Sequence, residues 1–134
     1  MNKPTLVSMV VVSLVFMAQA NANSTVCSSY NQKVEYSSET YTGGPAPHPG
    51  QVTSREKIVI GNVLSQERVT RTGGRTTGNW TVDVNLVDQQ ILQESGTGSF
   101  GSADFVSRLR VFEPRLGQTI ESFVICKRSW MYPP

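Results

Sequence analysis

The chain has 134 residues, with 12 lysine and arginine residues against 10 acidic residues and a formal net charge of +2. This near-neutral balance argues against nucleic acid or a strongly anionic surface as the partner. The length fits one domain behind an N-terminal leader and is too short for two domains.

Residues 1–22 have the three parts of a cleavable secretory signal peptide. Lys3 supplies a positive charge, an uncharged apolar stretch follows, and small residues come next at the A-x-A spacing that signal peptidase reads. The apolar stretch is short for a membrane span, which needs about 20 residues. We expect cleavage after Ala22, with Ala20 as the alternative, leaving 23–134 as a single periplasmic or secreted domain without a membrane span.

The two cysteines, Cys27 and Cys126, lie near opposite ends of this expected domain. Exported proteins mature in oxidising compartments, where thiols pair. We therefore expect one disulfide that joins the first strand to the last. A metal site would need more ligands than two thiols and the single histidine, and a catalytic thiol would need a basic partner. The sequence thus predicts no metal and no cofactor.

Apolar residues alternate with polar ones along most of the mature chain, which is the periodicity of half-buried strands. Val34 and Tyr36 share one face early in the chain, and later Leu109 and Val111 point inward while the arginines between and beside them point outward. The segments that we expect to form strands are 33–41, 55–60, 63–71, 80–86, 105–111 and 120–126.

Turn residues separate these segments. Gly61 and Asn62 can both take positive φ and so close a tight hairpin. The proline-rich stretch 43–50 cannot be a helix or a central strand, and we expect a surface loop there. Only 87–94 reads as a short helical turn. Short strands at regular spacing predict an all-β fold, a small antiparallel β-sandwich first and a small β-barrel as the alternative.

Groups for catalysis are sparse. His48, the only histidine, lies in the proline-rich loop, where a solvated side chain is the simpler interpretation. Asp83 with Glu94, or Asp88 with Asp104, would have to meet across strands to act as an acid and a base. Because sequence alone does not bring them together, we expect a protein that is not an enzyme, with a small carbohydrate-active enzyme as the less favoured option.

Residues 96–101 match the pattern GxGxxG literally. A dinucleotide-binding fingerprint requires a strand before it and a helix after it. Here the following segment has the alternation of a strand, so we interpret the motif as a glycine-rich hairpin loop.

Three arginines and several hydroxyls gather around the flexible Gly73-Gly74 turn, and the arginines are Arg68, Arg71 and Arg75. Guanidinium groups suit carboxylates and sulfates on a partner. The simpler interpretation is a strand end with solvated charges.

Trp130 and Tyr132 follow the second cysteine, beside Arg128. Aromatic residues and arginine are enriched at protein interfaces. The alternative, which we favour, is that this segment folds back over the end of the domain, since an exposed tryptophan is costly unless something covers it.

These observations predict an exported, non-enzymatic domain that binds another exported or envelope protein, such as an inhibitor or an immunity-type factor. The alternative is a subunit of a surface fibre or an adhesin. A donor-strand subunit needs an alternating apolar extension ahead of its domain, and only four residues would separate the expected cleavage site from Cys27. The oligomeric state stays open.

Overall fold

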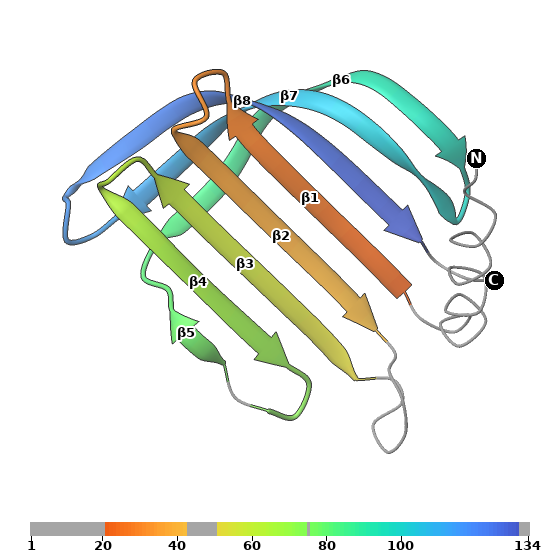
Figure 1. Cartoon of the computed structure of the whole chain (residues 1–134), viewed down its shortest axis with the longest axis horizontal. Helices are drawn as coiled ribbons and strands as arrows, with labels where there is room; N and C mark the ends of the chain where they lie inside the picture. The colour runs from red at the N-terminus through yellow and green to blue at the C-terminus, as the bar shows by residue number, and fades with distance from the viewer. Residues whose placement is uncertain (1–20, 43–50, 75, 132–134) are drawn as a thin grey trace, which may run out of the picture.

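The computed structural model describes residues 21–42, 51–74 and 76–131, and all regular structure in these residues is β-strand. The strands are β1 (Asn21–Ser29), β2 (Val34–Thr42), β3 (Val52–Ile60), β4 (Leu64–Arg71), β5 (Thr77–Asn79), β6 (Asp83–Thr97), β7 (Phe100–Glu113) and β8 (Gln118–Met131). They form one twisted antiparallel sheet in the order β5-β4-β3-β2-β1-β8-β7-β6 (Figure 1). Within the described ranges, no helix has the length and apolar character that a membrane crossing requires.

The first and last strands lie side by side in the middle of this sheet. Cys27 of β1 stands directly opposite Cys126 of β8, and the two form a disulfide across 99 residues of sequence. The predicted disulfide is therefore confirmed. From β1 the chain moves outward hairpin by hairpin to β5, and from β6 it returns inward to β8.

Residues 80–82 carry the chain from one edge of the sheet to the other, between β5 and β6. The expected strand 80–86 is therefore only partly a strand, because its pairing begins at Asp83. Its alternation is nevertheless real, since Val82 is buried and the other alternate apolar residues pack against the core.

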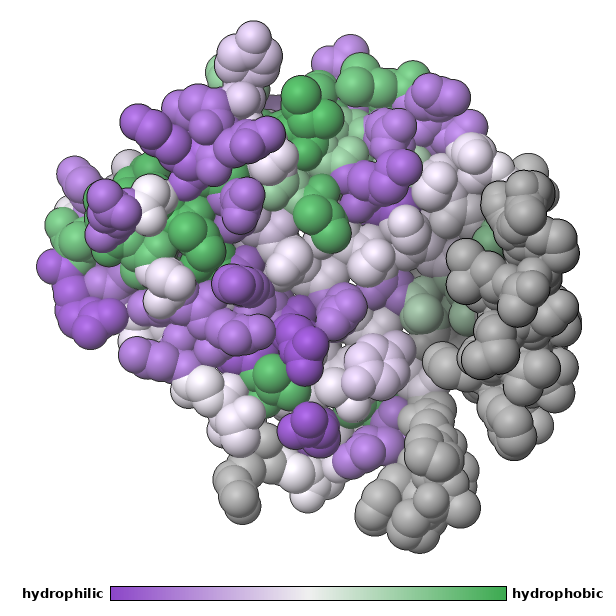
Figure 2. Space-filling model, in the orientation of Figure 1, coloured by the Kyte–Doolittle hydropathy of each residue, from purple (hydrophilic) through white to green (hydrophobic). Residues whose placement is uncertain are grey.

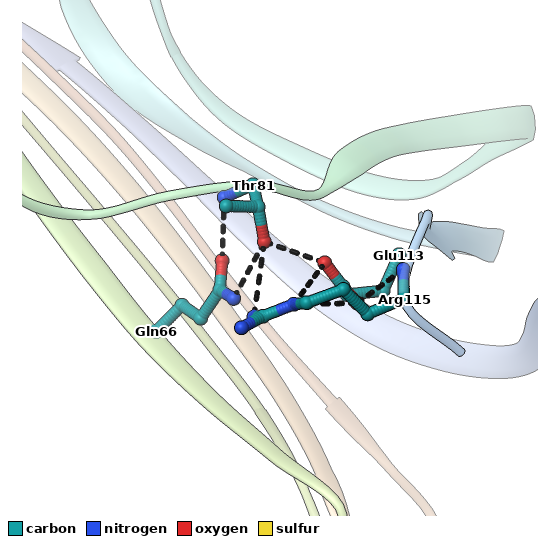
Figure 3. A network of polar contacts seen from close by, with 4 residues as sticks. All are labelled: Gln66, Thr81, Glu113 and Arg115. Atoms are coloured by element: carbon teal, nitrogen blue, oxygen red, sulfur yellow. Dashed lines mark hydrogen bonds and ion pairs between the residues drawn. The ribbon is translucent and has the colours of Figure 1, made fainter. Parts of the chain in front are cut away.

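A polar network fixes this crossover to both halves of the sheet (Figure 3). The Thr81 N–H donates to Gln66 Oε1 at 2.9 Å, and Gln66 Nε2 donates back to the Thr81 hydroxyl at 2.9 Å. That hydroxyl donates in turn to Glu113 Oε2 at 2.6 Å, and the Arg115 N–H donates to Glu113 Oε1 at 2.8 Å. The hydrogen bond from Thr81, followed by those from Arg115, lowers the pKa of Glu113, whose side chain is 3% exposed.

The core occupies one face of the sheet, called here the inner face. Tyr36, Cys27 and Cys126 stand opposite one another in register, so their side chains share this face. Ile58 and Phe105 continue the same row on the neighbouring strands, and both are fully buried. The predicted inward positions are confirmed, and the other buried apolar residues on the inner face of the strands include Val34, Ile60, Leu64, Leu109, Val111 and Val124.

The sheet is open at both edges. The edge strands β5 and β6 do not pair with each other, so the barrel alternative is not supported. The described strands belong to one hydrogen-bonded sheet, whose twist brings apolar residues of both halves into one core. The all-β antiparallel class is confirmed, while the second sheet of a sandwich is not seen in the described residues.

The helical turn expected at 87–94 is wrong, because β6 runs straight through that segment. Its pairing with β7 is irregular between Val87 and Gln90 and again between Ile91 and Gln93. Asp88 takes a φ of 53° inside the first irregularity. Such bulges interrupt the alternation of side chains, which removed the strand signal from the sequence.

The expected hairpin turns form, but the β3–β4 turn differs from the prediction in two respects. It takes in Val63 besides Gly61 and Asn62. Gly61 has a φ of 48°, whereas Asn62 is not among the described residues with positive φ. The GxGxxG segment is the hairpin between β6 and β7, as predicted. The loop 43–50, with His48, lies outside the described residues.

The face opposite the core, called here the outer face, exposes several large apolar side chains. In β8, Val124 and Cys126 point inward, so Phe123 and Ile125 point outward, where they are 75% and 56% exposed. Val26 of β1 is 56% exposed on the same face. Figure 2 shows one side of the molecule, on which such hydrophobic groups are interspersed with hydrophilic ones.

Candidate functional site

A groove of about 560 Å³ crosses the sheet at the end where β1 begins and β8 ends. Residues of β1, β2, β6, β7 and β8 border it. Its side chains come mainly from two cross-strand rows of the outer face. The pairing register of the strands therefore brings these residues together.

Four serines form one row on the groove floor. Ser24 stands opposite Ser129, Ser129 opposite Ser102, and Ser102 opposite Ser95, across four neighbouring strands. Serine side chains are small, so they leave space for the groove above them. Each hydroxyl can both donate and accept a hydrogen bond. Among the described residues, these four hydroxyls make no hydrogen bond, so they are available to a ligand.

Apolar and aromatic side chains form the neighbouring row. Ala22 stands between Tyr41 and Met131, and Phe100 stands opposite Met131. Tyr41 is 40% exposed and Phe100 is 68% exposed. Exposed aromatic rings beside a hollow are typical of surfaces that bind another molecule.

One charged side chain, Glu39, lines the groove in the described part of the chain. It continues the serine row onto β2, and its carboxylate lies 3.7 Å from Arg55 Nη1 on β3. Both side chains are about half exposed, so the ion pair is weak and is open to competition from a ligand.

The structure places Trp130 in β8 at the border of the groove. Its indole packs over Gly101, where an added Cβ would lie 2.8 Å from the ring atom Cζ2. The indole N–H donates to the carbonyl oxygen of Gly98 at 3.1 Å. Trp130 thus packs against the β6–β7 hairpin from within β8, which continues to Met131 instead of folding back after Cys126. Tyr132 lies outside the described residues.

Of the three arginines considered as candidates for a binding loop, Arg68 forms its contacts within the protein. It donates to Glu56 Oε1 from Nε at 3.0 Å and from Nη2 at 2.7 Å, and its guanidinium lies 4.9 Å from the centre of the Trp80 ring. The hydroxyl of Tyr36 donates to the other oxygen of the Glu56 carboxylate at 2.7 Å. Burial, followed by this hydrogen bond, raises the pKa of Tyr36 well above its usual range.

Arg71 is exposed at the end of β4, and Arg75 lies outside the described residues. Arg71 stands opposite Thr53, which stands opposite Tyr41 of the groove. Arg71 therefore shares the groove's face and end of the sheet, at a distance of two strand spacings from Tyr41, or about 10 Å.

The carboxylates considered for catalysis do not meet. Asp83 and Glu94 lie eleven positions apart on β6, which corresponds to about 36 Å along a strand. Asp88 pairs with Arg108, and Asp104 lies 4.0 Å from Lys127. In the described ranges, no group of three or more histidine, cysteine or acidic residues is placed to hold a metal ion.

Sequence reasoning missed most of the groove. Ser24, Ser95, Ser102 and Ser129 are scattered along the chain, and nothing local marks any of them. Of the groove residues within the described ranges, Trp130 is the one that residue type indicated. Comparison of the chain with protein-family models, curated proteins and solved structures finds no match.

Proposed function

We propose that the mature protein is an exported, non-enzymatic domain that binds another exported or envelope protein in this groove, as an inhibitor or immunity-type factor would. The observation that carries the proposal is the groove itself, with exposed Tyr41 and Phe100 beside a row of serine hydroxyls that make no hydrogen bond within the described ranges. Such a surface offers ring contacts and hydrogen bonds together, the combination found where proteins meet.

The outer face supports a protein partner rather than a small ligand alone. Val26, Phe123 and Ile125 are also exposed on this face beyond the groove. The ion pair of Lys127 with Asp104 stands in the same cross-strand row as Val26, so charged groups border these apolar side chains. Exposed apolar surface with a polar border marks interaction sites in soluble proteins. A partner seated in the groove would also lie against these residues and would supply a second layer over the open sheet, as in a sandwich.

The buried disulfide supports export. Cys27 and Cys126 are both paired, and disulfides persist in oxidising compartments such as the periplasm or the extracellular medium. The proposal includes both compartments as alternatives.

The test is affinity capture followed by a measured affinity. The mature domain is immobilised, envelope and culture-supernatant proteins are passed over it, and a retained protein is purified and titrated against variants. Tyr41→Ala and Phe100→Ala should each weaken binding by about tenfold or more, as expected of aromatic anchors. Tyr30→Ala is the matched control, because Tyr30 is 96% exposed in the β1–β2 turn at the other end of the sheet.

Equal affinity for the parent and both groove variants would contradict the proposal. Assembly of the purified domain into fibres, without a retained partner, would favour the surface-fibre alternative instead. Unchanged melting temperatures of the variants show that a loss of binding does not come from unfolding.

A further inference from the structure

The first two residues of β1 occupy central positions in the sheet. Asn21 stands opposite Thr42 of β2, and Ala22 stands between Tyr41 of β2 and Met131 of β8. The sequence leaves two signal-peptidase sites open, one on each side of this pair. The two possible products therefore differ in whether β1 reaches the ends of its neighbours.

Cleavage after Ala22 would remove both residues and leave a gap inside the sheet. Strands β2 and β8 lie on either side of β1, so they are two strand spacings apart, or about 10 Å. They cannot pair directly across that distance. The Cα atoms of Cys27 and Cys126 are 4.1 Å apart, which is the spacing of an antiparallel pair that is not hydrogen-bonded. Because the two kinds of pair alternate along a strand, Ala22 bonds toward Met131 of β8, and Asn21 bonds toward Thr42 of β2. Loss of both residues would leave backbone groups of Met131 and Thr42 without partners in the middle of the sheet, where partners are normally present.

Cleavage after Ala22 would also change the groove. The Ala22 side chain lies on the groove floor between Tyr41 and Met131. Without it, the row of apolar side chains would be interrupted at its centre. A chain that begins at Asn21 keeps the row and the register complete.

We propose that the signal peptide is removed after Ala20, so that the mature chain begins at Asn21. This inference rests on the export that is part of the proposed function. In the cleavage step, water adds across the peptide bond between the two residues, which leaves a carboxylate on Ala20 and an ammonium group on Asn21. The new positive charge stands one residue from the groove floor.

The first experiment is the intact mass of the protein recovered after export of the full chain. We expect the mass of a chain beginning at Asn21. A mass lower by one asparagine and one alanine residue overturns the inference and leaves export standing. A mass that includes Met1 overturns export itself, so the two failures are distinguishable.

A matched pair of variants tests the site independently of folding. Ala18→Lys disrupts the small-residue pattern only for cleavage after Ala20, whereas Ala22→Lys disrupts it only for cleavage after Ala22. Denaturing gels of the total protein should show that the first variant accumulates as precursor and that the second is processed normally. The opposite pattern overturns the assignment.

A stability measurement tests the physical reason. Two chains are produced with defined N-termini, one beginning at Asn21 and the other at Asn23, and both are refolded with the disulfide formed. We expect the shorter chain to melt several degrees lower, because it lacks the two residues that complete the centre of the sheet. Equal melting temperatures would overturn the register argument.

Discussion

Removal of the disulfide should have the largest effect of any small change to this protein. The perturbation is the double variant Cys27→Ala/Cys126→Ala, which deletes the bond between β1 and β8 and leaves small apolar side chains in its place. Both cysteines are almost fully buried, so alanine avoids placing a polar group there. The bond closes a loop of 99 residues, which is nearly the whole domain.

The expected magnitude follows from that loop. In the chain-entropy model, a cross-link closing about 100 residues contributes about 4.7 kcal/mol by restricting the unfolded state. Net stabilities of small domains are about 5–15 kcal/mol, so the bond represents a third or more of the total. At about 4 °C per kcal/mol for a domain of this size, the melting temperature should fall by about 15–20 °C.

The assay is thermal unfolding of the oxidised parent and of the double variant, monitored through the far-ultraviolet circular dichroism signal. A second comparison uses the parent protein after it has been unfolded, reduced and refolded in the presence of reductant. This reduced parent should have a melting temperature close to that of the variant. Reductant should leave the variant unchanged. A fall of less than about 5 °C would refute the reasoning, because strand pairing and the core would then hold the chain ends without help from loop closure.

Three other changes test separate parts of the structure. Glu113→Gln should reduce the loss of stability at acid pH. Because the pKa of Glu113 is lowered in the folded state, its ionised carboxylate stabilises the fold at pH values above the ordinary glutamate pKa, and this contribution is lost as pH falls through the folded-state pKa. Urea midpoints of parent and variant measured against pH check this. Gly101→Ala should cost about 1–3 kcal/mol, because the new Cβ would lie 2.6 Å from the Ser95 carbonyl oxygen and 2.8 Å from Cζ2 of Trp130. Displacement of the indole should shift tryptophan emission to longer wavelength, and unchanged emission would contradict the packing. Arg68→Ala should lower the free energy of unfolding by about 1 kcal/mol, because the ion pair with Glu56 and the contact with the Trp80 ring are lost. Arg71→Ala should change it by no more than about 0.5 kcal/mol and should weaken partner binding if the exposed arginine contributes to it. Equal urea midpoints for the two variants would contradict this difference.

The confirmed parts of the fold rest on short-range or unique features of the sequence. Alternation over a few residues marked the strands around Leu109 and Val124, because successive side chains of a strand point to opposite faces. The disulfide needed no spatial information, since the chain has only two cysteines. Gly61 indicated the β3–β4 hairpin through its backbone freedom, since it takes a positive φ there.

Prediction failed where the strand itself is irregular. Between Val87 and Gln93 the pairing with β7 shifts twice, and Ile91 and Leu92 are both exposed although they are adjacent. No period of two survives such bulges. The error was thus a consequence of local geometry that the partner strand imposes.

The sequence by itself determined the strand-rich class and the disulfide between Cys27 and Cys126. Only the tertiary structure decided where the groove lies. It aligned serines that are up to 105 positions apart in sequence into one row, from Ser24 to Ser129, because four strands pair in register. It also placed Arg68 in an ion pair within the protein, because strand pairing sets Glu56 directly opposite this candidate for a binding loop.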